Sequence, residues 1–207
     1  YTPNERNHVG SYRRIITIPA NWDGKQVIAH FGSVTSNMYL YVNGRFVGYS
    51  EDSKVAAEFD ITPYIHKGDN LISFQTFRWC DGSYSEDQDF WRLSGVARES
   101  YLYARDAGVH IDDLRITPDL INDYKDGTLE VKVDVTGRPV IDFELLNANG
   151  ITVAKSTADF KRHAYGTIRF SLRNVKKWTA ETPYLFTLVA TVKNGDKVTE
   201  VLTQKVG

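Results

Sequence analysis

Residues Met38–Tyr49 read MYLYVNGRFVGY, in which two aromatic and β-branched runs flank an Asn-Gly pair. The runs Met38–Val42 and Arg45–Tyr49 have the composition of β-strands. Asn43 and Gly44 between them are the strongest short signal for a hairpin, because a type I′ turn needs a positive φ at both central positions. This segment therefore predicts an antiparallel hairpin within a β-sheet.

Similar runs recur through the first half of the chain, roughly every ten residues, with Gly, Asn, Asp or Pro between them. Gly68–Asn70 is expected to form a turn before a strand, and Glu51–Glu58 a polar connector. We find no sustained helical period. Further strands are predicted at Ser11–Ile18, Gln26–Phe31, Leu71–Trp79 and Ser100–Ala104.

The second half shows strict alternation of apolar and polar residues. In Glu130–Val135 the valines share one face, and Ile141, Phe143 and Leu145 alternate with acids. About seven such strands in about 100 residues predict an immunoglobulin-like β-sandwich without the cysteine pair of antibody domains. The expected strands are Val109–Ile116, Glu130–Val135, Ile141–Leu145, Ile151–Ser156, Ile168–Leu172, Tyr184–Lys193 and Lys197–Thr203.

A drop in aromatic density near residues 105–108 places a domain boundary there, which divides the chain into domains 1–104 and 105–207. The 207 residues are enough for two domains, and 42% of them are hydrophobic, so each domain has material for a core. We therefore expect an all-β protein of two consecutive β-sandwiches.

Charge and composition exclude several functional classes. Lys and Arg number 25 against 26 Asp and Glu, so nothing attracts nucleic acid or an anionic membrane. No apolar run is long enough for a transmembrane helix, and the first residues do not resemble a signal peptide. The single cysteine, Cys80, forbids an internal disulfide and reads as a small buried side chain. The five histidines show no metal-ligand spacing.

The chemistry of the chain is concentrated in residues 78–95, RWCDGSYSEDQDFWRLSG. Carboxylates accept hydrogen bonds from sugar hydroxyls, and flat aromatic rings stack on the C–H face of a sugar. This Gly-punctuated loop between two predicted strands is therefore a candidate carbohydrate site. Its tryptophans, Trp79 and Trp91, are as compatible with core packing as with stacking on sugar.

Several segments carry a resemblance to a known family. Residues 37–53 match its hairpin, and residues 81–92 contain the combination Asp-Gly-Ser-Tyr, Glu-Asp-Gln-Asp and Trp-Arg. Residues 94–98 and 178–186 extend the match, although Val-Ala-Arg at 96–98 stands where the family usually has Ile-Phe-Arg. The chain resembles the large, multidomain β-galactosidases of glycoside hydrolase family 2.

The resemblance implies that 1–104 is most of a sugar-binding jelly-roll domain whose leading strands are missing. Residues 105–207 would be the immunoglobulin-like domain that leads into a catalytic (β/α)₈ barrel of about 250 residues. Retaining glycosidases use two carboxylates about 5 Å apart, and this family places both on the barrel. The resemblance therefore assigns no catalytic residue to this chain, and the chain alone is expected to be inactive.

For the site, the resemblance implies that Asp89 binds a galactosyl hydroxyl and helps to ligate a monovalent cation, Na⁺, together with the barrel. Glu86, Asp87, Trp91 and Arg92 would support the loop. An alternative role for Asp89 is to cap backbone N–H groups of the loop. No cofactor is expected for the chain alone, whereas Na⁺ and Mg²⁺ are expected in the full-length enzyme.

The expected partners are a β-galactoside substrate, the barrel of the same chain and further copies in a homo-oligomer, in the cytoplasm or the periplasm. Missing leading strands would expose a sheet edge, so residues 1–104 are expected to self-associate or to be marginally stable. Three alternatives are a free-standing carbohydrate-binding module with a fibronectin-like partner domain, another family 2 activity such as β-mannosidase or β-glucuronidase, and a purely structural adhesion protein. The Glu-Asp-Gln-Asp sequence argues against the second, and the third leaves the acidic loop unexplained.

Overall fold

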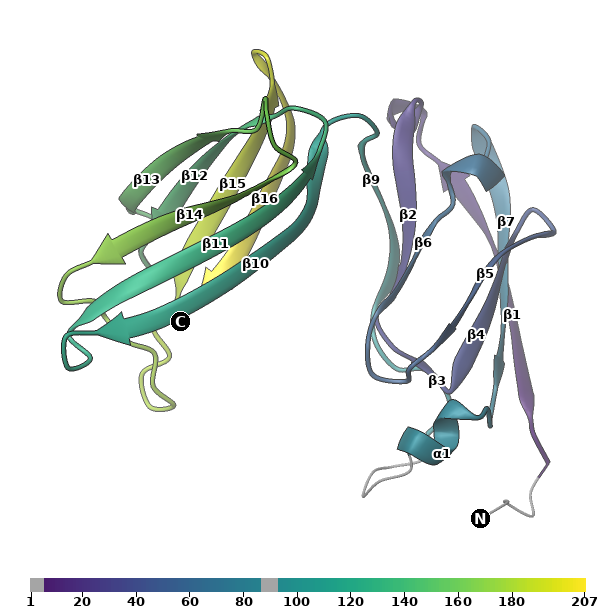
Figure 1. Cartoon of the computed structure of the whole chain (residues 1–207). Helices are drawn as coiled ribbons and strands as arrows, with labels where there is room; N and C mark the ends of the chain where they lie inside the picture. Colours follow the sequence, from purple (N-terminus) through teal and green to yellow (C-terminus); the bar gives the residue numbers. More distant parts are fainter. Residues whose placement is uncertain (1–5, 87–92) are drawn as a thin grey trace. The chain divides into compact units, whose positions relative to one another are not determined.

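The computed structural model describes residues 6–86 and 93–207. The chain divides into two compact units, Tyr1–Ala104 and Arg105–Gly207 (Figure 1). Each unit is a sandwich of antiparallel sheets, so the predicted all-β fold is confirmed. Within the part of the chain that is described, no helix has the length and apolarity needed to cross a membrane.

The larger sheet of the first unit contains the predicted Asn-Gly hairpin. Asn43 and Gly44 have φ values of 51° and 77°, as a type I′ turn requires. The Asn43 side chain also accepts a hydrogen bond from the backbone N–H of Leu71 (2.9 Å), which ties the turn to the neighbouring strand. In order across the sheet, the strands are β1 (Val9–Ile18), β7 (Gly68–Phe77), β4 (Asn37–Val42) and β5 (Arg45–Glu51).

The opposing layer of this unit is a three-stranded sheet. Its order is β6 (Ala57–Asp60), β2 (Lys25–Phe31) and β9 (Ser100–Asp106), and a short pair, β3 (Val34–Thr35) and β8 (Gly95–Val96), lies beside it. The connections include two 3₁₀ helices, Ala20–Trp22 and Thr62–Tyr64. The core between the layers is built from alternate residues of the central strands, namely Val27, Ala29, Phe31, Met38, Leu40 and Val42.

Two local predictions were wrong. Gly68–Asn70, expected as a turn, already belongs to β7 and pairs with the end of β1. The chain does turn sharply at Gly68 (φ 88°), but the Asn70 side chain bonds the backbone N–H and carbonyl of His66 and so lets pairing begin at once. The acidic stretch contains a helix, α1 (Gly82–Glu86), which is too short to produce a periodic signal.

One side of the first unit is open. The strands β1 and β9 each have a single hydrogen-bonded neighbour among the described residues. A cavity of about 420 Å³ lies against both strands, and it is lined by the core residue Phe31 and by Phe74, which is partly buried and packs against the core. Unpaired strand edges invite pairing with another chain. The expected self-association stays a prediction, which sedimentation of the purified chain would test.

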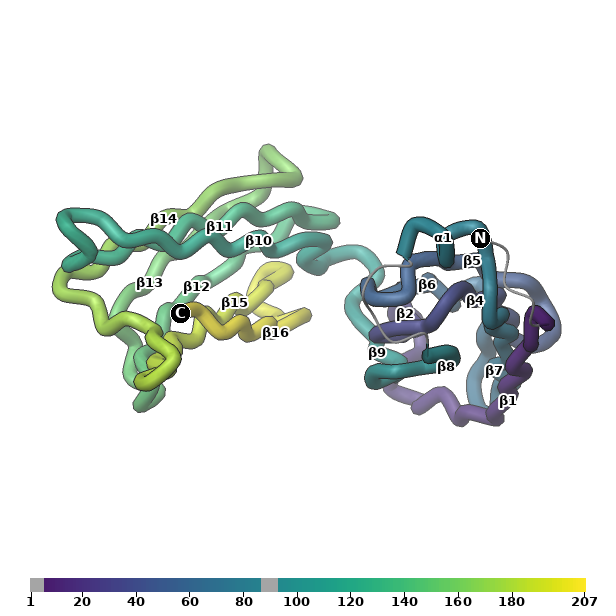
Figure 2. The backbone as a smooth tube through the Cα atoms, turned by 90° about the horizontal axis from the view of Figure 1, so that it is seen from below, coloured from purple at the N-terminus to yellow at the C-terminus, as the bar shows by residue number. Residues whose placement is uncertain are grey.

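The second unit, all of whose residues are described, has the predicted seven strands in two sheets (Figure 2). The fourth strand of this unit, β13, pairs with the third, β12. The sheet that contains the first strand therefore has three strands and the other has four, whereas in a constant antibody domain the sheet with the first strand has four and the other has three. One sheet is β10 (His110–Ile121), β11 (Asp126–Thr136) and β14 (Tyr165–Leu172). The other is β13 (Thr152–Asp159), β12 (Val140–Leu146), β15 (Phe186–Asn194) and β16 (Lys197–Val206).

The alternation in the second half of the chain sets which side chains face inward. Val131, Val133 and Val135 of β11 are buried, as are Ile141, Phe143 and Leu145 of β12. Their polar neighbours form pairs on the outer faces, for example Arg169 with Glu130 and Lys193 with Asp142, both at 2.6 Å. The predicted inward faces are confirmed.

Candidate functional site

The acidic loop is closed at its base. The stretch 78–95 begins directly after β7 and ends at β8, which pairs with β3. The Arg78 guanidinium donates a hydrogen bond to the Ser94 hydroxyl at 2.8 Å and so joins the two ends. At the second end, Gly95 has a φ of 103°, which residues with a side chain rarely adopt. Both stems of the loop are therefore held by the sheet framework.

Two serine hydroxyls, Ser36 and Ser83, attach α1 to this framework. Ser83 accepts a hydrogen bond from the Cys80 backbone N–H at 3.0 Å and shares one with the Ser36 hydroxyl at 2.7 Å. Ser36 is buried and its hydroxyl also lies 3.2 Å from the Arg78 carbonyl. Serine suits these positions because its hydroxyl both donates and accepts within a small volume.

Glu86 fixes the end of α1. Its carboxylate accepts hydrogen bonds from the backbone N–H of Ser53 (2.8 Å) and from the Ser53 hydroxyl. Ser53 is only 1% exposed, and its carbonyl accepts a hydrogen bond from the Ser33 hydroxyl. The carboxylate thus satisfies two polar groups that are shielded from water. The described hydrogen bonds of the Glu86 carboxylate thus connect α1 to Ser53, a residue of the same unit.

The other loop residues singled out in the sequence are not described. Asp87, Asp89, Trp91 and Arg92 lie outside the described residues. Their expected roles in substrate binding, Na⁺ ligation and loop support therefore stay predictions. What the structure describes is the pair of anchored stems, Glu86 on one side and Ser94 on the other, between which these residues are connected.

Replacing Glu86 by alanine is expected to loosen this stem. The change leaves the Ser53 N–H and hydroxyl without their acceptor, at a cost of about 1–3 kcal/mol for the buried polar groups. Hydrogen exchange at the Ser53 amide should therefore become about tenfold to a hundredfold faster, since about 1.4 kcal/mol corresponds to a factor of ten. Glu99→Ala, at an exposed glutamate of the same unit, is the control and should leave the Ser53 amide unchanged. Equal exchange in both variants would contradict the anchoring role.

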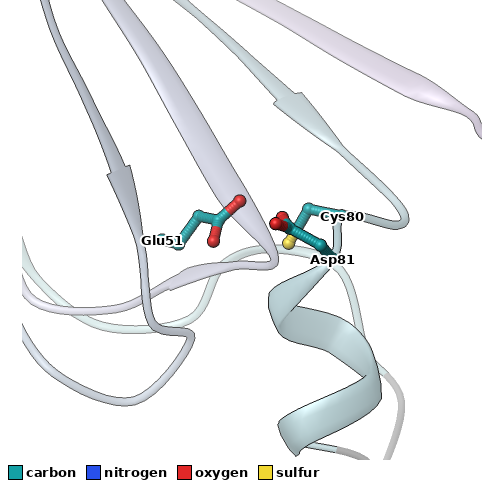
Figure 3. Close-up of side chains that lie close together, drawn as sticks. All are labelled: Glu51, Cys80 and Asp81. Atoms are coloured by element: carbon teal, nitrogen blue, oxygen red, sulfur yellow. The ribbon is translucent and has the colours of Figure 1, made fainter.

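A second cluster of polar side chains lies at the N-terminal end of α1. Ligand atoms of Glu51, Cys80 and Asp81 lie within 4.8 Å of one another (Figure 3). The two carboxylates offer the oxygen atoms that hard cations prefer, whereas the Cys80 sulfur is a softer ligand. A Cβ at position 82 would lie 3.3 Å from Glu51 Oε2, so glycine keeps this side of the carboxylate open.

Tyr49 orients the Glu51 carboxylate. The Tyr49 hydroxyl donates a hydrogen bond to Glu51 Oε1 and accepts one from the buried Asn37 amide at 3.3 Å. Burial raises the pKa of the Tyr49 phenol well above its usual range, and the hydrogen bond to Glu51 raises it further. The phenol is thus held as a donor, and Glu51 is directed toward Cys80 and Asp81.

This pKa shift predicts a dependence of stability on pH. Tyrosine in an unfolded chain loses its proton near pH 10, whereas folded Tyr49 retains it at that pH. Above pH 10 the unfolded state therefore binds fewer protons, and the free energy of unfolding falls as the pH rises. Urea unfolding of the first unit on either side of this pH should show the fall. Tyr49→Phe, which has no proton to lose, should show a smaller one, and an identical fall in both would contradict the assignment.

Sequence reasoning missed this cluster. The sequence predicts a polar connector that begins at Glu51 and a small buried side chain at Cys80. Cys80 is instead half-buried, with its sulfur 3.8 Å from the Ser36 carbonyl. No local pattern joins Glu51 to Asp81, because they meet only where β5 ends beside the start of α1.

Trp79 is half-buried, and the Asn7 side chain bonds both its backbone N–H and its carbonyl at 2.9 Å.

Comparison with protein families accounts for both units. Residues 2–106 match the model of the sugar binding domain of glycosyl hydrolases family 2, and residues 109–207 match a second model of glycosyl hydrolases family 2. The chain belongs to glycosyl hydrolase family 2. It comprises the sugar-binding jelly roll and the immunoglobulin-like domain of that family, which are non-catalytic.

Curated relatives are named β-galactosidase. The chain is 38% identical to that of Priestia megaterium over all of its length and 39% identical to that of Halalkalibacterium halodurans over 99% of it. It spans only about a fifth of each relative, 21% and 20%.

Two solved structures share the fold of the chain at low identity. A β-glucuronidase of Bifidobacterium dentium, solved with coumarin-3-O-glucuronide, aligns with a TM-score of 0.84 at 22% identity over 98% of this chain and 40% of its own. A β-glycosidase of Bacteroides vulgatus aligns with a TM-score of 0.82 at 22% identity, over 96% of this chain and 26% of its own. These likenesses concern the fold alone.

Proposed function

We propose that this chain is the non-catalytic N-terminal region of a retaining β-galactosidase that hydrolyses terminal β-D-galactosyl residues. The observation that carries the proposal is the match along the whole chain to relatives of that name at 38–39% identity. The anchored acidic loop of the sugar-binding domain supports it, because carboxylates beside aromatic residues suit a sugar. The catalytic barrel would belong to the same polypeptide.

In this proposal Asp89 acts at the edge of the active site. As a carboxylate it accepts a hydrogen bond from a galactosyl hydroxyl and offers an oxygen to Na⁺, a hard cation. The two carboxylates that cleave the glycosidic bond would come from the barrel. Glu86 and the Arg78–Ser94 contact hold the two ends of the stretch that contains Asp89.

A site whose supporting segments are already held in place binds substrate with a smaller loss of conformational entropy. The two β-sandwiches would then carry Asp89 to the barrel without taking part in bond cleavage. We also propose that the full-length enzyme binds Mg²⁺.

The test compares substrates in the full-length enzyme. We expect hydrolysis of a chromogenic β-galactoside with retention of configuration, and a kcat/KM for the matching β-glucuronide at least a hundredfold lower. The purified 207-residue chain should hydrolyse neither sugar. If the enzyme prefers the glucuronide, the proposed specificity for β-galactosides is wrong, although the assignment to the family stays. Tight galactoside binding by the chain alone would instead favour an independent carbohydrate-binding module.

A further inference from the structure

The second unit has an apolar hollow at one end of its sandwich. The hollow has a volume of about 610 Å³ and opens between the β10–β11 turn and the connection from β14 to β15. Its lining includes the core residues Leu129, Phe170 and Phe186, which are nearly inaccessible, and at its rim Trp178 is 51% exposed. An indole half in water beside an open end of a core indicates a surface that another apolar group covers.

The last residues of the chain lie in this hollow. Val206 and Gly207 both belong to its lining. A Cβ at position 207 would lie only 2.8 Å from Leu185 Cδ2 and 3.2 Å from Trp178 Cβ. The backbone at Gly207 therefore passes closely between these two side chains, and a chain that continues from it leaves through the hollow.

The register of β16 sets the direction of the next side chains. Val206 pairs with Phe186 and points into the core with 8% exposure. Side chains of a strand alternate between its faces, so the residue two positions after Val206 points to the same side as Val206. If pairing continues, that residue lies opposite Tyr184, whose ring packs edge-on against Phe186 at 5.2 Å.

We infer that the hollow is the docking site for the segment that directly follows Gly207 in the full-length polypeptide. An apolar side chain two positions after Val206 enters the hollow and closes the end of the core. The side chain three positions after Val206 lies on the face that Gly207 turns toward Leu185 and Trp178, and it covers Trp178. The segment thereby fastens the immunoglobulin-like domain to the beginning of the next domain. This inference rests on the proposal that the chain belongs to a longer enzyme, since the curated relatives are about five times as long.

The test is hydroxyl-radical labelling of Trp178 in the full-length protein, read by mass spectrometry against the same residue in the unfolded protein. We expect Trp178 to be protected several-fold more than its 51% exposure here would allow, at every protein concentration. Replacing the residue three positions after Val206, on the face that Gly207 turns toward Trp178, by aspartate should restore labelling. Aspartate one position later, on the opposite face of the strand, is the matched control and should not.

Unprotected Trp178 in the full-length protein would overturn the inference. Protection that disappears on dilution would overturn it in favour of a second copy. Protection that survives the aspartate on the Trp178 face would overturn it in favour of a distant segment. If the aspartate variant does not fold, alanine at the same position should still increase labelling. Labelling needs no activity, so an error in the proposed sugar specificity would leave these results unchanged.

Discussion

Asp89→Asn in the full-length enzyme is expected to lower kcat/KM for a β-galactoside by about 10²–10³-fold, the loss typical of removing one group that stabilises a transition state. Asparagine keeps the size of the side chain but loses the charge, so both the acceptor for the sugar hydroxyl and the ligand for Na⁺ are weakened. Steady-state kinetics with a chromogenic galactoside, over a series of Na⁺ concentrations, would measure the effect. The Na⁺ concentration for half-maximal rate should also rise.

The matched control is Asp87→Asn, two residues away in the same loop. If Asp87 supports the loop, its replacement should reduce kcat/KM much less and should leave the Na⁺ dependence unchanged. Circular dichroism of both variants should match that of the parent enzyme, since neither change removes an apolar side chain. An unaltered kcat/KM in Asp89→Asn, or an equal loss in both variants, would refute the role proposed for Asp89.

Phe143→Ala is expected to destabilise the second unit by about 3–5 kcal/mol, the usual cost of removing a buried phenylalanine ring. Phe143 lies on β12 at the centre of the core with 0% exposure, so the cavity that alanine leaves has no access to solvent. The loss is a large part of the stability of a domain, about 5–15 kcal/mol. Hydrogen exchange, measured at increasing denaturant concentrations, would give the free energy of unfolding of each unit separately.

The first unit should show the same exchange rates in Phe143→Ala as in the parent, because its core is a separate cluster. Val201→Ala, at a position that is 55% exposed in the same unit as Phe143, serves as the control and should cost less than about 0.5 kcal/mol. Equal destabilisation by the two substitutions would contradict the central place of Phe143 in the core. Faster exchange in the first unit of Phe143→Ala would show that the two cores are not independent.

Local sequence patterns were sufficient where one face of a strand is buried. In β11 and β12 every second residue is apolar, and a shift of one residue would turn all of them toward water. Asn43-Gly44 likewise allowed one turn type, because positive φ at both positions suits few residues. Both signals depend only on residues that are close together in the sequence. The strands and the hairpin could therefore be predicted from the sequence.

The site depended on contacts between residues far apart in the chain. Glu86 meets Ser53 across 33 positions, and the ligand atoms of Glu51 and Asp81 come together only because β5 ends beside α1. The five-residue helix α1 has no hydrophobic period, and the contacts that hold it, with Ser36 and Ser53, are far away in the sequence.

The order of residues thus specified two all-β units and their inward faces, because alternation and turn conformation are local. The anchoring of the acidic loop and the opening at the end of the second core arose only on folding. Hydrogen-bond partners and cavity walls are chosen by distance in space, which distance along the chain does not reveal.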